Sequence, residues 1–162
     1  MSIPDPDPSI LAAFWSRART GIAHTEPGLA LPHEPPSAWG FGATPQHADA
    51  LLALVIDGIK TGTSSALWDY EVSGEPLPQR GQLDIVTDGS GTPRAVLLNT
   101  ALEILPFRDV DAAHAHAEGE GDRSLAHWRD VHERFFTAYA GHDRGFSPDM
   151  PVVVERFRVI HC

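Results

Sequence analysis

The sequence predicts a mixed α+β fold, and two kinds of hydrophobic spacing support this prediction. Apolar residues recur at helical spacing near the N-terminus, after residue 44 and again after residue 123. Between residues 94 and 105 they alternate instead, which is typical of a long strand whose two faces meet different surroundings. Helices combined with a bent strand of this length indicate an α+β domain with a small curled sheet.

The first 39 residues predict a helix followed by an extended arm. Ser9 is placed to cap a helix over 9–19, in which Ile10, Phe14 and Ala18 recur at helical spacing. Residues 21–39 are rich in proline and glycine, as expected of a wrapping arm. We therefore divide the chain into an N-terminal extension, 1–39, and a main domain, 40–162. The extension could cover a cleft or mediate dimerisation.

The main domain is expected to begin with a helix and end with a strand. Thr44 and Pro45 form a favourable helix start, and Gly58 is placed to end that helix. The elements expected after it are an extended segment at 60–65, a helical turn at 66–72, a strand near 83–86, a hairpin turn at 88–91, the strand at 94–105, a loose helical stretch at 108–117, a helix at 123–140 and a terminal strand at 152–160.

Composition places the chain among globular proteins, with 42% hydrophobic and 21% charged residues. No run approaches the ~18 apolar residues of a membrane span, and the first residues lack the features of a signal peptide. The single cysteine, Cys162, cannot form an internal disulfide. We expect a cytoplasmic protein with no membrane partner, as a monomer or homodimer.

The net charge of −10 argues against tight binding to a long duplex, which requires several cations on one face. A nucleoside, a short strand or an RNA loop remains compatible with a local positive pocket. Of the 12 basic residues only Lys60 is a lysine. Arginine cannot replace lysine where a proton must leave near neutral pH, although a lone lysine can also be an accident of the surface.

Three stretches of the main domain form a recognisable pattern. Gly58-Ile59-Lys60-Thr61-Gly62-Thr63 follows the first helix, Ala-Glu-Gly-Glu-Gly-Asp-Arg-Ser-Leu precedes a helix that carries Trp128, and Phe-Ser-Pro-Asp-Met-Pro-Val-Val precedes the last strand. With these stretches, residues 40–160 resemble the ASCH domain family. The resemblance implies a PUA-like β-barrel flanked by helices, with a cleft beside the lysine segment and a theme of RNA binding.

The resemblance also implies candidate catalytic residues. Some ASCH relatives are described as N4-acetylcytidine amidohydrolases and others as ribonucleases. The functional lysine, threonine and glutamate of the amidohydrolase branch fall on Lys60, Thr63 and Glu120. That branch has an arginine two residues after the second threonine, and this chain has Ser65 there.

The residues themselves allow such chemistry. A threonine hydroxyl is a poor nucleophile until a base takes its proton, and a partly buried lysine can serve as that base. Lys60 and Thr63 point to one side only if the chain bends, which Gly62 permits. Glu120, between two glycines, could shuttle protons or orient Lys60. Alternatively, the hydroxyls satisfy backbone groups and Glu120 is a helix-entry carboxylate.

Substrate-binding candidates lie close to these residues. Trp68 and Tyr70 could stack a base or pack in the core. Arg123 is a pocket candidate by its proximity in sequence to Glu120, and Arg156 and Arg158 could contact phosphate or form solvated or ion-paired groups. The remaining candidates are the hydroxyl residues Thr61 and Ser64.

No metal or cofactor is expected. The close histidine pairs, His114 with His116 and His127 with His132, lack the i,i+4 spacing that places two ligands on one helix face. The sequence therefore predicts a hydrolase, of ribonuclease or amidohydrolase type, acting on RNA or a nucleoside derivative. The alternatives are a non-catalytic module that binds RNA or a modified nucleoside, and a structural domain without a ligand.

Overall fold

The computed structural model describes residues 1–162 and confirms the α+β class. Its elements in chain order are α1 (Pro8–Thr25), β1 (Ala38–Trp39), α2 (Pro45–Ile56), β2 (Gly62–Ala66), α3 (Leu67–Ser73), β3 (Leu83–Thr87), β4 (Pro93–Pro106), the 3-10 turn η1 (Phe107–Asp109), α4 (Ala112–Glu118), α5 (Leu125–Tyr139) and β5 (Pro151–His161). The five strands pair in the order β1-β3-β4-β5-β2. This sheet is open, with β1 and β2 as its end strands, so the expected barrel closure is not seen.

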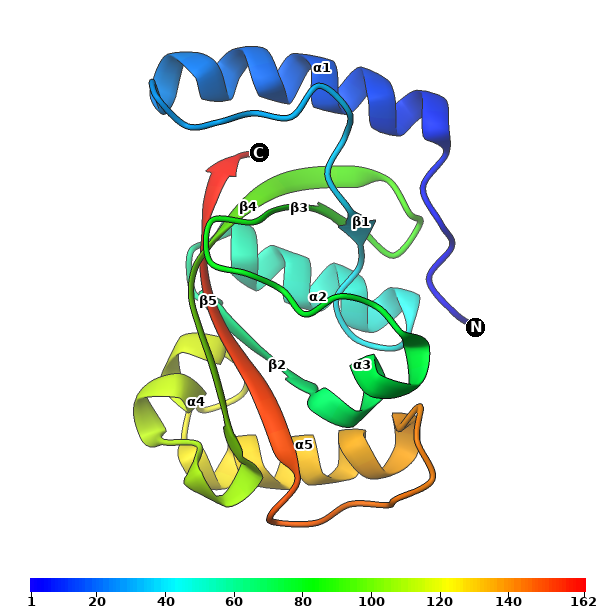
Figure 1. Cartoon of the computed structure of the whole chain (residues 1–162), viewed down its shortest axis with the longest axis vertical. Coiled ribbons are helices and arrows are strands. Elements are labelled where there is room, and N and C mark those ends of the chain that lie inside the picture. Colours follow the sequence, from blue (N-terminus) through cyan, green and yellow to red (C-terminus); the bar gives the residue numbers. More distant parts are fainter. The chain divides into compact units, whose positions relative to one another are not determined.

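The chain divides into two compact units, of which the first comprises residues 1–58, 81–98 and 158–162. Its core is one face of α1, with Phe14, Trp15, Ala18 and Ile22, packed against Ile85 and other apolar residues of β3 and β4. The segment after α1 runs back alongside it (Figure 1). Trp15 Nε1 donates a hydrogen bond to the Pro32 carbonyl over 3.3 Å.

Helix α1 differs from the prediction at both ends. It begins after Asp7, whose carboxylate accepts hydrogen bonds from the backbone N–H groups of Ser9 and Ile10. Asp7 followed by Pro8 is a stronger start signal than Ser9, because proline suits the first helical position. The helix also continues to Thr25, so part of the predicted arm is helical, and residues 38–39 form β1.

The hairpin expected at 88–91 is confirmed. β3 and β4 pair antiparallel, with Leu83 opposite Leu98 and Ile85 opposite Val96. The Asp88 carboxylate accepts hydrogen bonds from the backbone of Ser90 and Thr92, which closes the turn.

The second unit comprises residues 59–80 and 99–157 and contains every residue predicted for the site except Arg158, which belongs to the first unit. β2 pairs antiparallel with β5, placing Gly62 opposite Arg156, Thr63 opposite Glu155 and Ser64 opposite Val154. Because side chains alternate along a strand, Gly62 and Ser64 share one face and Thr63 lies on the other. Thr63 therefore does not share the face of Ser64.

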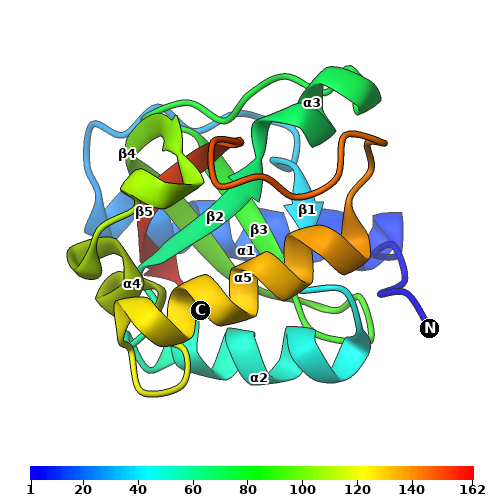
Figure 2. The same cartoon turned by 90° about the horizontal axis from the view of Figure 1, so that it is seen from below.

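Helix α5 packs on the face of β2 and β5 that carries Ala66, Val152 and Val154 (Figure 2). Its buried residues are Trp128, His132 and Phe136, which recur every four residues and so share one face of the helix predicted over 123–140. Tyr139, the last helical residue, is exposed and contacts Phe135. The buried face of α5 therefore ends at Phe136, before the helix does.

Two short helices of this unit end at glycines with similar backbone conformations. Gly74 after α3 has φ +72 and nothing near the position of a Cβ atom. Gly119 after α4 has φ +76, and a Cβ there would lie 2.7 Å from the Ile59 carbonyl oxygen. Thr61 N–H also donates to the Ala117 carbonyl over 2.7 Å. The end of α4 is thus tied to the lysine segment.

This contrast gives a matched test. Alanine at position 74 should cost about 1–2 kcal/mol of unfolding free energy, the cost of the left-handed conformation alone. Alanine at position 119 adds a backbone collision and should cost more than G74A. Urea unfolding of G74A and G119A measures the difference. Equal losses would show that α4 and the lysine segment can separate at no cost.

Candidate functional site

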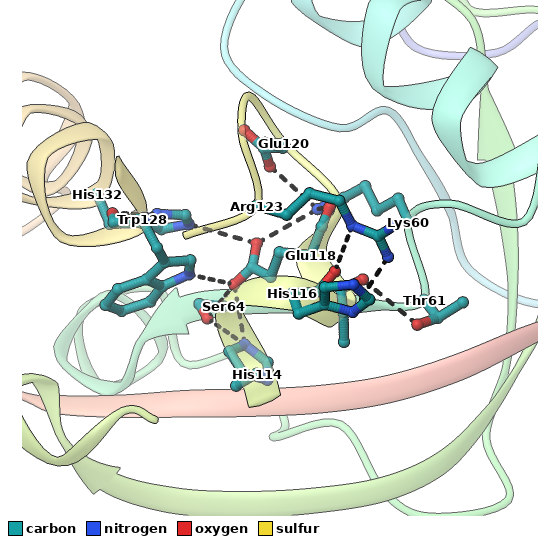
Figure 3. A network of polar contacts seen from close by, with 11 residues as sticks. Lys60, Thr61, Ser64, His114, His116, Glu118, Glu120, Arg123, Trp128 and His132 are labelled. Atoms are coloured by element: carbon teal, nitrogen blue, oxygen red, sulfur yellow. Dashed lines mark hydrogen bonds and ion pairs between the residues drawn. The ribbon is translucent and has the colours of Figure 1, made fainter. Parts of the chain in front are cut away.

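Lys60 is buried and surrounded by oxygen atoms. The residue precedes the first residue of β2, Gly62, by two positions in the chain, and it is 2% exposed. Nζ contacts Glu120 Oε1 at 3.1 Å, Glu118 Oε2 at 3.3 Å and the Glu118 carbonyl at 3.4 Å (Figure 3). Two of the three predicted catalytic residues, Lys60 and Glu120, are thus in direct contact.

The Glu118 carboxylate is the hub of this cluster (Figure 3). The residue ends α4 and is 1% exposed. Oε1 accepts hydrogen bonds from Trp128 Nε1 at 2.8 Å, from His114 Nε2 at 2.9 Å and from the Ser64 hydroxyl. His132 Nε2 lies 3.4 Å from Oε2. Lys60, Ser64, His114, Trp128 and His132 therefore all converge on one carboxylate.

This convergence keeps Glu118 ionised. Burial alone raises the pKa of Glu118, but the charges of Lys60 and His132, with the hydrogen bonds from His114 and His132, hold that pKa well below its ordinary value of 4.5. A carboxylate whose lone pairs are all engaged has no capacity left to take a proton from a substrate. Glu118 is therefore a structural anion.

His132 carries part of the balancing charge. Its ring stacks on Trp128, with centroids 4.3 Å apart, and its Nδ1 donates to the Trp128 carbonyl over 2.9 Å, leaving Nε2 to face Glu118. Burial lowers the pKa of His132, but the charge and hydrogen bond of Glu118, with the charge of Glu120, raise it above 6.5. The imidazolium form is thereby stabilised.

His114 links the cluster to a pocket of about 370 Å³ within the second unit. Its Nε2 contacts both Glu118 and, at 2.8 Å, the Ser64 hydroxyl, and its ring forms part of the pocket wall. The remaining lining residues are Ala101, Leu102, Glu103, Leu105, Asp109, Val110, Asp111, Val154 and Arg156.

The other predicted substrate-binding residues make mainly structural contacts. Thr61 Oγ1 donates to the Ala117 carbonyl, and Arg123 donates to the carbonyls of His116 and Ile59. Tyr70 Oη and the Ser65 hydroxyl lie 3.1 Å apart. Trp68 packs edge-on against His142 and under the Arg144 guanidinium.

Thr63 is not part of the cluster. It lies on the face of β2 opposite to Ser64, and its hydroxyl makes no hydrogen bond with Lys60 or Glu120. Ser64, by contrast, which was predicted only to bind substrate, contacts the hub directly.

The sequence argument overlooked four residues of the cluster, which are Glu118, His114, Trp128 and His132. One signal for them was present: His114 and Glu118 are four residues apart, the spacing at which side chains meet on a helix. A search restricted to pairs of histidines could not find a histidine paired with a carboxylate.

Ligand atoms of Glu118, Glu120 and His132 lie within 4.8 Å of one another, as in a metal site. However, the Lys60 amine lies close to both carboxylates and already supplies positive charge there. A divalent cation would have to share this space with an ammonium group, which is unfavourable.

Comparison with known proteins assigns the family. The sequence model described as the ASCH domain matches residues 37–161. The chain belongs to the ASCH domain family. No curated protein sequence matches it significantly. No helix of this ASCH protein is long and apolar enough to cross a membrane.

Solved structures agree with this assignment. Protein EF3133 from Enterococcus faecalis V583, of family DUF984, is 34% identical, with a TM-score of 0.82 over 94% of this chain and 89% of its own. An ASCH domain from Lactobacillus crispatus JV V101 is 26% identical, with a TM-score of 0.79 over 93% of this chain and 94% of its own. Hypothetical protein PH0355, at 13% identity and a TM-score of 0.51 over 75% of this chain and 96% of its own, shares only the fold.

Replacing each carboxylate with its amide tests the division of roles within the cluster. Glu118→Gln leaves Lys60 and His132 without their buried anion, so about 3–5 kcal/mol of unfolding free energy should be lost. Glu120→Gln, whose side chain is 25% exposed, should cost less than about 1 kcal/mol. Denaturant unfolding measures both variants. If E118Q is as stable as E120Q, Glu118 is not the hub.

The two pKa shifts predict a stability maximum in mildly acidic solution. The lowered pKa of Glu118 gives stability that is present above pH 4.5 and is lost as the pH falls. The raised pKa of His132 gives stability that is present below pH 6.5 and is lost as the pH rises through the higher folded value. Melting temperature should therefore fall on both sides of the range from 4.5 to 6.5.

The variant His132→Asn serves as the control for this measurement. It should melt at a lower temperature than the wild type and lose part of the decline seen above pH 6.5. A wild-type melting temperature that rises from pH 6.5 to 8.5 would contradict the charge assigned to His132.

Proposed function

We propose that this ASCH domain protein is a hydrolase that acts on RNA or a nucleoside derivative, with Glu120 as its general base. The contact between the Lys60 amine and Glu120 Oε1 carries the proposal. Membership of the ASCH family suggests an RNA-related function, in line with the PUA-like kinship that we also propose. The net charge favours a nucleoside or short strand.

Glu120 is suited to accept a proton because it is only partly engaged. Its Oε1 is held by Lys60, while Oε2 has no hydrogen-bond partner and the side chain is 25% exposed. A water molecule can therefore reach this oxygen, whereas the buried oxygens of Glu118 are all occupied. The attacking nucleophile in this proposal is water: its oxygen bonds to the acyl carbon or the phosphorus, and its proton passes to Glu120. As the bond to the amine or alcohol leaving group breaks, Glu120 returns that proton to the leaving group.

Lys60 acts in this scheme as the counter-ion that positions Glu120. The Lys60 amine is buried and already donates to both carboxylates, so its N–H groups are engaged and it is not placed to take the proton of a hydroxyl. The role of base therefore passes from Lys60 to Glu120. Thr63 can take part only if a substrate reaches the opposite face of β2, where it could serve as a substrate contact.

A second candidate is a non-catalytic module for RNA or modified nucleosides. One observation favours it: Lys60 is 2% exposed and has three oxygen contacts, as expected of a purely structural ion pair. This reading assigns Glu120 no proton transfer. The two candidates therefore differ in what the Glu120 carboxylate does.

Hydrolysis assays on N4-acetylcytidine and short single-stranded RNAs separate the two candidates. Glu120→Gln should lower kcat at least about 100-fold with little change in KM, since a general base contributes at this scale. The exposed Glu133 provides a control, and E133Q should keep wild-type rates. Wild-type protein that binds these ligands without turnover would establish the binding module. Turnover by E120Q at the wild-type rate would exclude Glu120 as the base.

A further inference from the structure

The pocket beside His114 has the size and the walls of a small-molecule site. Its volume of about 370 Å³ lies within the range of roughly 300–1,000 Å³ that is usual for such sites. Apolar side chains, Leu102, Leu105, Val110 and Val154 among them, can contact the faces of a flat ring. The charged and polar side chains of the pocket are few: Glu103, Asp109, Asp111, His114 and Arg156.

Arg156 is a donor without a partner. It lies on β5 and is half-buried, and its guanidinium makes no hydrogen bond or ion pair. Arg158, two residues further on, is by contrast ion-paired with Glu26 at 2.6 Å. Opposite Arg156, a Cβ at Gly62 would lie 3.3 Å from Arg156 Cδ and 3.4 Å from His114 Cε1. The absence of a side chain at Gly62 leaves room for both pocket residues.

His114 adds an acceptor. The residue is 5% exposed, and both of its side-chain hydrogen bonds use Nε2. With Nε2–H donating to the Glu118 carboxylate, Nδ1 carries the lone pair of the neutral ring. Nδ1 makes no hydrogen bond, so an acceptor on a residue that lines the pocket is left for a ligand to use.

The charges of the pocket disfavour an anionic ligand. The lining includes three carboxylates, those of Glu103, Asp109 and Asp111, and only one guanidinium, that of Arg156. Asp111 accepts a hydrogen bond from His114 N–H and Asp109 Oδ1 lies 3.9 Å from Arg108 Nε, which leaves acceptor capacity on Asp109 as well as on Glu103. Phosphate would be repelled by the carboxylates. A neutral ring that offers N–H donors and one acceptor satisfies all of these groups.

We infer that this pocket binds an amino-bearing nucleobase, with Arg156 donating to a ring or carbonyl acceptor and with Glu103, Asp109 and His114 Nδ1 accepting from the amino and ring N–H groups. Carboxylates pair with the cytosine amino group and arginine pairs with guanine acceptors in known base recognition. The inference rests on the proposed function, which supplies the ligand class. It adds that the nucleobase is the recognised part of the substrate and that these pocket residues recognise it.

Calorimetric titration of the wild-type protein tests the inference directly, with ligands in matched pairs. Cytidine and uridine differ in the 4-amino group, and guanosine and inosine differ in the 2-amino group. The amino-bearing member of at least one pair should bind at least about 10-fold more tightly, the effect of a hydrogen bond to a charged group. Cytidine 5′-monophosphate should bind no more tightly than cytidine, and inorganic phosphate should not compete.

Two variants locate the binding site. Arg156→Gln should weaken binding of the preferred nucleoside at least 10-fold, while Arg80→Gln, at an exposed arginine, should leave it unchanged. Asp109→Asn should reduce the discrimination within the preferred pair. Thermal melting confirms that each variant is folded. Phosphate binding that R156Q abolishes, equal affinity within both pairs, or an unchanged affinity in R156Q would overturn the inference.

The variants R156Q and E120Q, assayed for both binding and hydrolysis, separate failure of this inference from failure of the proposed function. If the protein binds amino-bearing nucleosides through Arg156 but never hydrolyses a substrate, the pocket assignment stands and the hydrolase proposal falls. If it hydrolyses substrate through Glu120 with a KM that R156Q leaves unchanged, the hydrolase stands and the pocket assignment falls. The surface control E133Q should bind nucleosides as the wild type does.

Discussion

The second unit depends on one buried carboxylate. Glu118 draws the lysine segment, β2, α4 and α5 together, because its partners Lys60, Ser64, His114, Trp128 and His132 come from all of these elements. Burying a charge of this kind costs several kcal/mol, which only a complete set of partners can offset. The arrangement is therefore all-or-none: a missing donor would leave an unpaired charge in the core.

Much of the fold could be predicted from local pattern. Hydrophobic spacing located the helices and strands, and turn residues such as Asp88 located the hairpin. The start of α1 was misplaced because two capping signals competed within three residues, and Asp7 with Pro8 prevailed over Ser9. The closure of a barrel could not be predicted, because strand order depends on pairings between distant segments.

Only some residues of the site could be predicted from local pattern. Lys60 and Glu120 stood out through their motifs, and the structure brings them together. The importance of Glu118 was hidden, because its contacts with Lys60 and Ser64 span more than 50 residues and leave no periodic signal. The placement of Thr63 depended on whether the chain bends after Lys60. In the structure β2 begins at Gly62 and alternates regularly, so Thr63 and Ser64 face opposite ways.

The two-sided position of His114 has a thermodynamic consequence. His114 lines the pocket and its Nε2 also hydrogen-bonds the Glu118 anion. A contact that fixes the protonation of one ring nitrogen therefore fixes that of the other. A ligand that donates a hydrogen bond to Nδ1 holds the proton on Nε2 and thereby strengthens the hydrogen bond from Nε2 to Glu118. By linkage the effect is mutual. A ligand bound in the pocket raises the unfolding free energy of the second unit, and a substitution that weakens the contacts of Glu118 lowers the affinity for that ligand.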